Sequence, residues 1–190
     1  MPTTSSFQAV IDANGTSHGF LVDNGLLLQC QWNPEAGRWE QGEAVPGAVG
    51  GDSLSVIYLD KLWPTSSTSS SGTWNPGLVV AYRTGRGNGS EIQAVFGQWN
   101  SNGELQWSAP QALTSNGVNE KEFSLVAGVN GGFSLVSQKQ EERPGAEGTA
   151  TGLGIARPDT ELYREDFALQ RDADSPSGYG LQVAAGSSLQ

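Results

Sequence analysis

The chain has 190 residues and a formal net charge of −10 at pH 7, from 10 basic and 20 acidic side chains. This balance argues against a nucleic-acid partner and against an anionic membrane surface, because no basic face exists to neutralise phosphates. A single cysteine excludes an internal disulfide framework. No apolar run reaches the roughly 18 residues of a membrane-spanning helix, so we expect no membrane insertion.

Residues that favour tight turns are frequent. The chain contains 26 glycines and only 16% charged residues, which is typical of an all-β protein with many reversals. Asn-Gly occurs six times, and its last four copies, from Asn88 to Asn130, follow one another at intervals of 14 residues. Asn-Gly is the preferred centre of a two-residue type I′ turn, since both positions need a positive φ. We therefore predict an antiparallel meander through the middle of the chain.

Six strand-like segments occupy the N-terminal half. Asn14-Gly15 and Asn24-Gly25 separate the first three, and a looser turn at 33–37 precedes the fourth. Alternating or short apolar runs mark each segment. The predicted strands are Phe7–Asp12, Ser17–Val22, Gly25–Trp32, Arg38–Val45, Ser53–Leu59 and Gly77–Arg83.

The C-terminal half continues the pattern with polar interruptions. Residues 64–75, whose Ser-rich part lies between Trp63 and Trp74, and residues 140–152 are polar and low in complexity, so we predict mobile loops there. The segment Glu161–Gln170 fits either a short helix or a strand. The predicted strands are Ser90–Asn100, Glu104–Leu113, Glu122–Val129 and Gly132–Lys139.

An internal repeat organises these strands. Gln31-Trp32-Asn33 recurs 67 residues later as Gln98-Trp99-Asn100, and a Gly, a second Trp and a Pro follow each copy. We interpret the chain as a single all-β domain, 1–190, of about three units at roughly 8–60, 76–129 and 131–190. Repeated four-stranded antiparallel meanders are typical of β-propeller blades. The alternative is a β-sandwich built from the same strands.

Three blades are too few for a closed ring, since natural propellers typically use about 4–8. Exposed blade faces and edges must be covered. We therefore expect either a homo-oligomer or continuation in a longer chain.

The Trp-bearing hairpins resemble the repeats of bacterial neuraminidase-type (sialidase-like) β-propellers. Residues 33–39 and 100–107 stand where that family carries its Asp-box, although the spacing from Gly to Trp is two and four residues instead of three. The resemblance covers about residues 8–139 and implies a propeller fold. It also implies an alternative function, a sialidase-like glycoside hydrolase fragment.

The hairpins are also similar, more weakly, to those of fucose-binding propeller lectins. Arg83 matches the upstream arginine of those lectins in one unit. Gln29 and Ala94 replace the sugar-binding carboxylate, so the resemblance carries no fucose site with it.

Aromatic side chains are the best candidates for ligand contact. An indole face can stack on the apolar face of a sugar while its N–H finds a polar partner. The alternative is that the tryptophans only join neighbouring strands as cross-strand pairs. The candidate ligand-binding residues are Trp32, Trp39, Trp99, Trp107 and Arg83.

We predict no catalytic residues, metal or cofactor. A hydrolytic triad would need His18, the only histidine, which lies beside a predicted turn. Cys30 alternates within a strand and is expected to be buried and inert. One Cys and one His cannot form a zinc centre. The segment 172–178 only partly fits a calcium loop, because Pro176 replaces a ligand.

The sequence therefore favours a non-catalytic binding or interaction module of the β-propeller type. Its expected ligand is a carbohydrate or a protein. A structural spacer repeat of a large surface protein is a further alternative to the hydrolase fragment. The start of the chain lacks a signal peptide, so an extracellular or cell-surface location is expected only if the chain is excised from a larger secreted protein.

Overall fold

All described secondary structure is β-strand. The computed structural model describes residues 6–49, 51, 53–65, 74–85, 90–115, 119–128, 131–140, 160–175 and 178–184, and these residues form strands and turns without a helix. The predicted all-β class with antiparallel meanders is confirmed. The segment Glu161–Gln170 is part of a strand.

The strands form three antiparallel sheets, in which spatial order follows chain order. Sheet 1 contains β1 (Ser6–Ile11), β2 (Ser17–Asp23), β3 (Leu26–Asn33) and β4 (Arg38–Val49). Sheet 2 contains β5 (Leu54–Pro64), β6 (Trp74–Thr84), β7 (Glu91–Trp99), β8 (Leu105–Trp107) and β9 (Gln111–Ala112), which also pairs with β7. Sheet 3 contains β10 (Asn119–Ala127), β11 (Gly132–Gln140), β12 (Thr160–Arg171) and β13 (Tyr179–Ala184).

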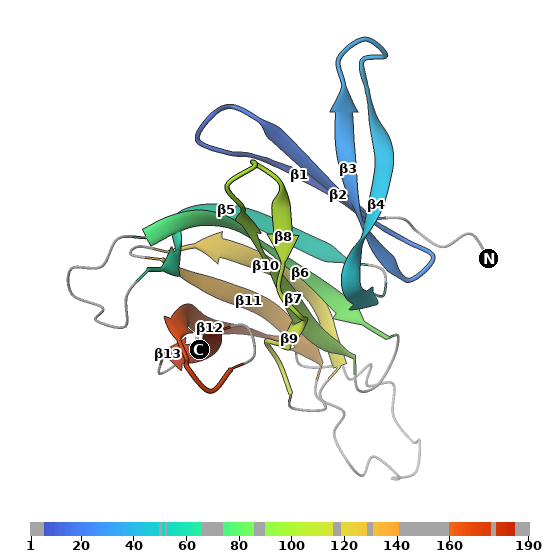
Figure 1. Ribbon diagram of the computed structural model, residues 1–190. Helices are drawn as coiled ribbons and strands as arrows, with labels where there is room; N and C mark the ends of the chain where they lie inside the picture. The colour runs from blue at the N-terminus through green and yellow to red at the C-terminus, as the bar shows by residue number, and fades with distance from the viewer. Residues whose placement is uncertain are drawn as a thin grey trace, which may run out of the picture.

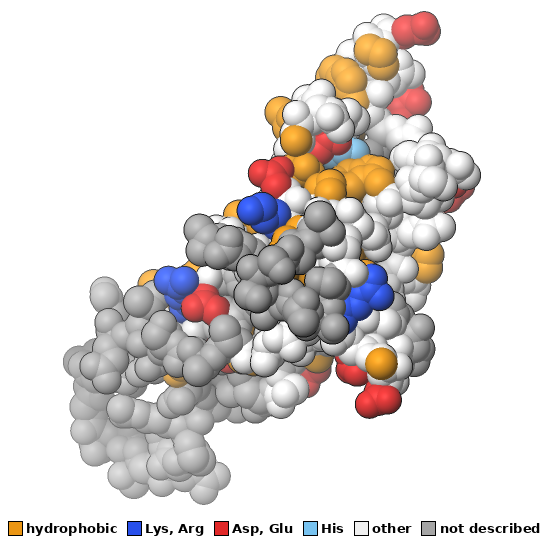
Figure 2. Space-filling model, turned by 60° about the vertical axis from the view of Figure 1, so that its left-hand side comes forward, with side chains coloured by type: hydrophobic (Ala, Val, Ile, Leu, Met, Phe, Trp, Pro, Cys, Tyr) orange, Lys and Arg blue, Asp and Glu red, His pale blue; other side chains and the backbone are white. Residues whose placement is uncertain are grey.

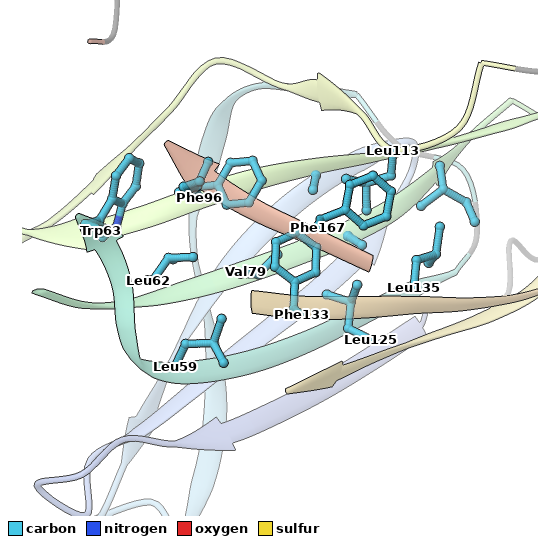
Figure 3. Packing of buried hydrophobic residues seen from close by; sticks show 14 residues of the cluster. Leu59, Leu62, Trp63, Val79, Phe96, Leu113, Leu125, Phe133, Leu135 and Phe167 are labelled. Atoms are coloured by element: carbon cyan, nitrogen blue, oxygen red, sulfur yellow. The ribbon is translucent and has the colours of Figure 1, made fainter. Parts of the chain in front are cut away.

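Sheet 2 lies between the other two sheets (Figure 1). One hydrophobic cluster joins sheets 1 and 2, and includes Phe20, Leu27, Leu78 and Val95. A second cluster joins sheets 2 and 3, and Figure 3 shows Phe96, Phe133 and Phe167 at its centre. Sheet 2 is therefore apolar on both sides, as the near-continuous apolar run of β6 requires.

The first strands of successive sheets are joined by hydrogen bonds from backbone to side chain. The Val56 N–H of β5 donates to Gln8 Oε1 of β1 at 3.1 Å, and the Leu125 N–H of β10 donates to Ser55 Oγ of β5 at 2.9 Å. The edge strands β5 and β10 thereby satisfy outward-facing N–H groups.

The sheet boundaries differ from the predicted unit boundaries of 8–60, 76–129 and 131–190. β5 begins sheet 2 instead of ending the first unit, and β10 begins sheet 3 instead of ending the second. The sequence repeat locates the hairpins, but hydrogen bonding to β6 and to β11 decides which sheet β5 and β10 join.

The predicted loops fall largely outside the described residues. This holds for 66–73 and for 141–152. The predicted ends of the first loop are strand residues, because Pro64 pairs with Trp74. Gln140 likewise belongs to β11.

Two of the described Asn-Gly turns differ from the predicted type I′ geometry. Asn24 has a φ of 49° and Gly25 a φ of 77°, as a type I′ turn needs. At Asn14-Gly15 and Asn102-Gly103 only the glycine has a positive φ. There the preceding Asp12 and Asn100 close three-residue loops through their own backbone and side chains.

Candidate functional site

The turns of the two Trp-bearing hairpins have the same hydrogen-bonding pattern. In both, an Asn closes the turn: Asn33 Oδ1 accepts two backbone N–H groups after β3, and Asn100 Oδ1 accepts two after β7. Each Asn also donates from Nδ2 to a Glu across the hairpin. This shared Asx turn explains why Asn recurs at both places.

The second tryptophans of the two hairpins are not equivalent. Trp32 stands opposite Trp39, whereas Trp99 stands opposite Leu105 and Trp107 stands opposite Gly97. Trp107 therefore lies two positions further from its turn than Trp39 does. Trp32 and Trp99 correspond, but Trp39 and Trp107 do not.

Trp32 and Trp39 belong to the side of sheet 1 that points away from sheet 2. We call this side the outer face and define it by Phe7, Ile11, Leu26, Trp32 and Trp39, which the register places on one side of the sheet. No described strand packs on it. Four of its members are large exposed hydrophobic side chains: Phe7 (43% exposed), Ile11 (64%), Leu26 (45%) and Trp32 (47%).

An aromatic row crosses the outer face. The rings of Trp32 and Trp39 meet edge to face with centroids 5.6 Å apart, and the rings of Trp39 and Phe7 are 5.5 Å apart. Gly19 of β2 lies beneath this row, and a Cβ there would come within 2.7 Å of the Trp39 ring. Glycine thus lets the Trp39 indole lie across the sheet.

Trp99 and Trp107 face the opposite side of sheet 1. The Trp107 ring meets the edge of Phe20, which is fully buried, and the Trp99 ring lies 5.5 Å from the His18 ring. Sheet 1 therefore separates the two tryptophan pairs. Figure 2 shows hydrophobic side chains gathered beside the histidine of this interface.

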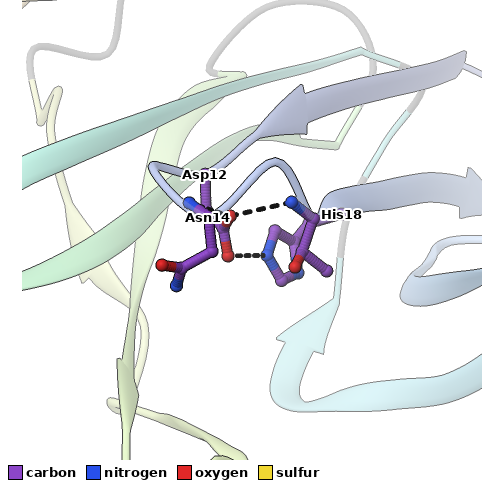
Figure 4. A network of polar contacts seen from close by, with 4 residues as sticks. Asp12, Asn14 and His18 are labelled. Carbon is purple, nitrogen blue, oxygen red and sulfur yellow. Dashed lines mark hydrogen bonds and ion pairs between the residues drawn. The ribbon is translucent and has the colours of Figure 1, made fainter.

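The His18 ring contacts the Asp12 carboxylate across the first hairpin. His18 Nε2 lies 3.1 Å from Asp12 Oδ2, and the two side chains are 12% and 8% exposed (Figure 4). Asp12 Oδ1 accepts the N–H groups of Asn14 and Thr16. Burial alone would raise the pKa of Asp12, but the bonds from the His18 ring and from the turn N–H groups outweigh it, so this pKa lies below its ordinary value.

Tyr58 of sheet 2 is the third polar side chain, after Asp12 and His18, at the interface between sheets 1 and 2. Its ring lies 6.2 Å from the Trp99 ring. Burial, followed by a hydrogen bond to the Asp60 carboxylate, raises the pKa of the Tyr58 hydroxyl. Asp12, His18 and Tyr58 thus hold the β1–β2 turn against β5, which is a role in packing.

Arg83 lies apart from all four tryptophans. It sits at the end of β6 opposite Ile92, whereas Trp99 lies at the other end of β7. Its backbone pairs with Ser53 and Gly51. The five candidate residues therefore occupy three separate places, and only Trp32 and Trp39 share an exposed surface.

Trp63 and Trp74 have structural partners. Trp63 is buried, donates from Nε1 to the Gly97 carbonyl at 3.2 Å, and stacks edge to face on Tyr179 of sheet 3. The Trp74 ring lies against Gly131. Both side chains help to join sheets 2 and 3.

Cys30 is buried beneath the outer face, and burial raises the pKa of its thiol.

In the β12–β13 turn, Asp172 Oδ1 accepts the Asp174 N–H, which makes it an Asx turn. Among the described residues no group of three or more His, Cys, Asp or Glu side chains is arranged to hold a metal ion. The described part of the chain also contains no helix able to cross a membrane.

The chain matches no protein-family model and no curated protein. The outer face must therefore be interpreted from its own residues. Three of these, Phe7, Ile11 and Leu26, were not among the sequence candidates. Their signal is present in the sequence, since β1 and β3 carry apolar residues at both odd and even positions, a pattern typical of strands covered on both sides.

Proposed function

We propose that this chain is a non-catalytic interaction module of the β-propeller type that binds a protein partner through the outer face of sheet 1. The single observation that carries the proposal is the exposed aromatic and aliphatic surface around Trp32 and Trp39. Contiguous apolar patches of this kind are rare on soluble monomers and mark interaction sites.

The propeller architecture is supported by the way the sheets succeed one another. Each is an up-and-down meander, and the first strands β1, β5 and β10 are joined in sequence by the Gln8 and Ser55 hydrogen bonds. Blades arranged around an axis place their first strands side by side in this manner. The number of blades in the complete assembly belongs to the proposal.

A protein partner is favoured over a carbohydrate by the composition of the face. Sugars need aromatic faces combined with several polar groups that fix their hydroxyls. Here Ile11 and Leu26, which are aliphatic and exposed, lie on the same face as the tryptophans. Aromatic side chains surrounded by aliphatic ones are typical of the centres of protein interfaces.

The test places a photo-reactive p-benzoylphenylalanine at Leu26 in cells that make the protein. A matched variant carries the same group at Val183, which is also exposed but lies in sheet 3. We expect a defined cross-linked protein from position 26 and none from position 183. Binding of that partner, once purified, should weaken at least about tenfold on Trp32→Lys.

Two results would replace the proposal. A glycan-array signal that Trp32→Ala abolishes, with no protein cross-link, would assign the face to carbohydrate. Turnover of fluorogenic glycosides would restore the hydrolase alternative. If position 26 yields neither a protein nor a glycan, the outer face is not a binding surface.

A further inference from the structure

We infer that the protein partner is a second copy of this chain, whose sheet 3 packs on the outer face of sheet 1. This inference rests on the proposed function, because it names the partner of the same face. It begins from the two corresponding tryptophans. Trp99 is covered by the preceding sheet, where His18 lies against its ring, whereas Trp32 is 47% exposed. The covering that Trp99 receives from sheet 1 is the covering that Trp32 lacks.

The surface able to supply this covering is the side of sheet 3 that points away from sheet 2, which we call the far side. The register places Ser124, Val126 and Leu162 on it, together with the ion pair of Arg164 and Asp166. Val126 is 50% exposed and Leu162 is 55% exposed. Among the described residues, the two sheets at the ends of the row therefore each have one face on which no other sheet packs.

Ser124 occupies in sheet 3 the position that Ser55 occupies in sheet 2, and Ser55 joins two sheets. Ser55 precedes Val56, whose N–H donates to Gln8 of the preceding sheet, and Ser55 Oγ accepts from the following sheet. Ser124 likewise precedes Leu125, whose N–H donates to Ser55. The Ser124 hydroxyl donates to the Leu125 carbonyl at 3.4 Å and keeps its lone pairs as acceptors.

A following sheet would meet Ser124 with the outward N–H groups of its own first strand. β1 of a second copy supplies them, because β1 is the edge strand of sheet 1 and pairs with β2 alone among the described strands. The contact joins two different surfaces, so it is heterologous. Two copies that exchange it twice would close a ring of six sheets, within the range of about 4–8 blades that propellers use.

The experiment measures the molar mass by sedimentation velocity from low micromolar to several hundred micromolar protein. The wild type should form a dimer that dissociates on dilution. Trp32→Lys places a charge on the outer face and Val126→Lys places one on the far side. Each substitution should raise the dissociation constant of the dimer at least about tenfold. Val183→Lys is the matched control, since Val183 is 60% exposed but lies on the other side of sheet 3.

Mixing the two variants decides the geometry. Trp32→Lys keeps its far side and Val126→Lys keeps its outer face, so an equimolar mixture should recover a dimer that neither variant forms alone. Circular dichroism and urea unfolding confirm that both variants fold. If two outer faces met in the dimer instead, only Trp32→Lys would dissociate it, and no mixture of the variants would restore the dimer mass. That result would overturn the inference.

A wild-type monomer at every concentration also overturns the inference. It leaves the proposed function intact if the photo-reactive group at position 26 cross-links a different protein. If that group traps nothing, the proposed function fails as well. The two failures are therefore distinguishable.

Discussion

The indole of Trp39 lies across Gly19, so close that a Cβ at Gly19 would be 2.7 Å from two ring carbons. Gly19 has no side chain to displace the ring, and the ring in turn reaches Phe7 on β1. The aromatic row of the outer face therefore depends on the absence of one methyl group.

Gly19→Ala should lower the free energy of unfolding by about 1–3 kcal/mol, because the added methyl overpacks the contact with Trp39. Urea unfolding measures the loss. In a Trp39→Ala background the same substitution should cost about 0.5 kcal/mol or less, since the clashing ring is gone. An equal cost in both backgrounds would show that Trp39 does not depend on Gly19.

The two tryptophan pairs should differ in their contribution to stability. Trp107→Ala should lower the free energy of unfolding by about 2–4 kcal/mol, because the ring packs between Gly97 and the buried Phe20. Trp32→Ala should cost about 1 kcal/mol or less, since the ring is half exposed. Urea unfolding of both variants checks this order, and similar losses would contradict the separation of the pairs by sheet 1.

The sequence predicted local structure well because turn chemistry is local. The apolar runs between the Asn-Gly turns predict most strands from Phe7 to Lys139 with errors at their ends, but the predicted strand Glu104–Leu113 is two short strands, β8 and β9. The Trp-Asn repeat found both hairpins. These features depend on the nearest neighbours in the chain.

Features that depend on distant neighbours were not predictable. Trp32 and Trp99 have the same flanking residues, yet only Trp99 is covered, because a sheet precedes it. β10 resembles the end of a meander until its register with β11 is known. Arg83 matched a motif, but its place at the end of β6 follows from strand pairing alone.

The turn geometry predicts unequal effects for the asparagines. Asn24→Ala should lower the free energy of unfolding by about 1 kcal/mol, because Asn24 has a φ of 49° and alanine resists that conformation. Asn24→Gly should be nearly neutral. Asn14→Ala should cost about 0.5 kcal/mol or less, because Asn14 has no positive φ. Thermal unfolding compares the three, and a larger loss at Asn14 would contradict this assignment.

Asp12 should make stability depend on pH in the acidic range. Its pKa is lower in the folded chain than the ordinary value of 3.8. This contribution is therefore fully present above about pH 4 and is lost as the pH falls through the folded pKa. Asp12→Asn should cost about 1–2 kcal/mol at pH 7 and nearly nothing at low pH, where the wild-type carboxyl is protonated.

Urea midpoints of wild type and Asp12→Asn between pH 2 and pH 7 measure the difference. Glu35→Gln, at an exposed turn position, controls for the loss of one negative charge. A gap between wild type and Asp12→Asn that stays constant with pH would show that the His18 pair does not contribute through the charged carboxylate.

Tyr82 should make stability fall at alkaline pH. Burial raises its pKa from 10.0 to about 12, and its hydroxyl donates to Gln93 Oε1 at 3.1 Å. Between these two values the unfolded chain loses the phenol proton and the folded chain retains it. The contribution of Tyr82 to stability is therefore constant below pH 10 and declines above it, by about 2–3 kcal/mol at pH 12. Tyr82→Phe should be about 1 kcal/mol less stable at pH 7 because it loses the hydrogen bond. Above about pH 11 the order should reverse, since phenylalanine does not ionise. Urea midpoints of both proteins at pH 7 and above about pH 11 measure this reversal of their order of stability. Parallel declines for the two proteins would show that Tyr82 titrates as an exposed phenol.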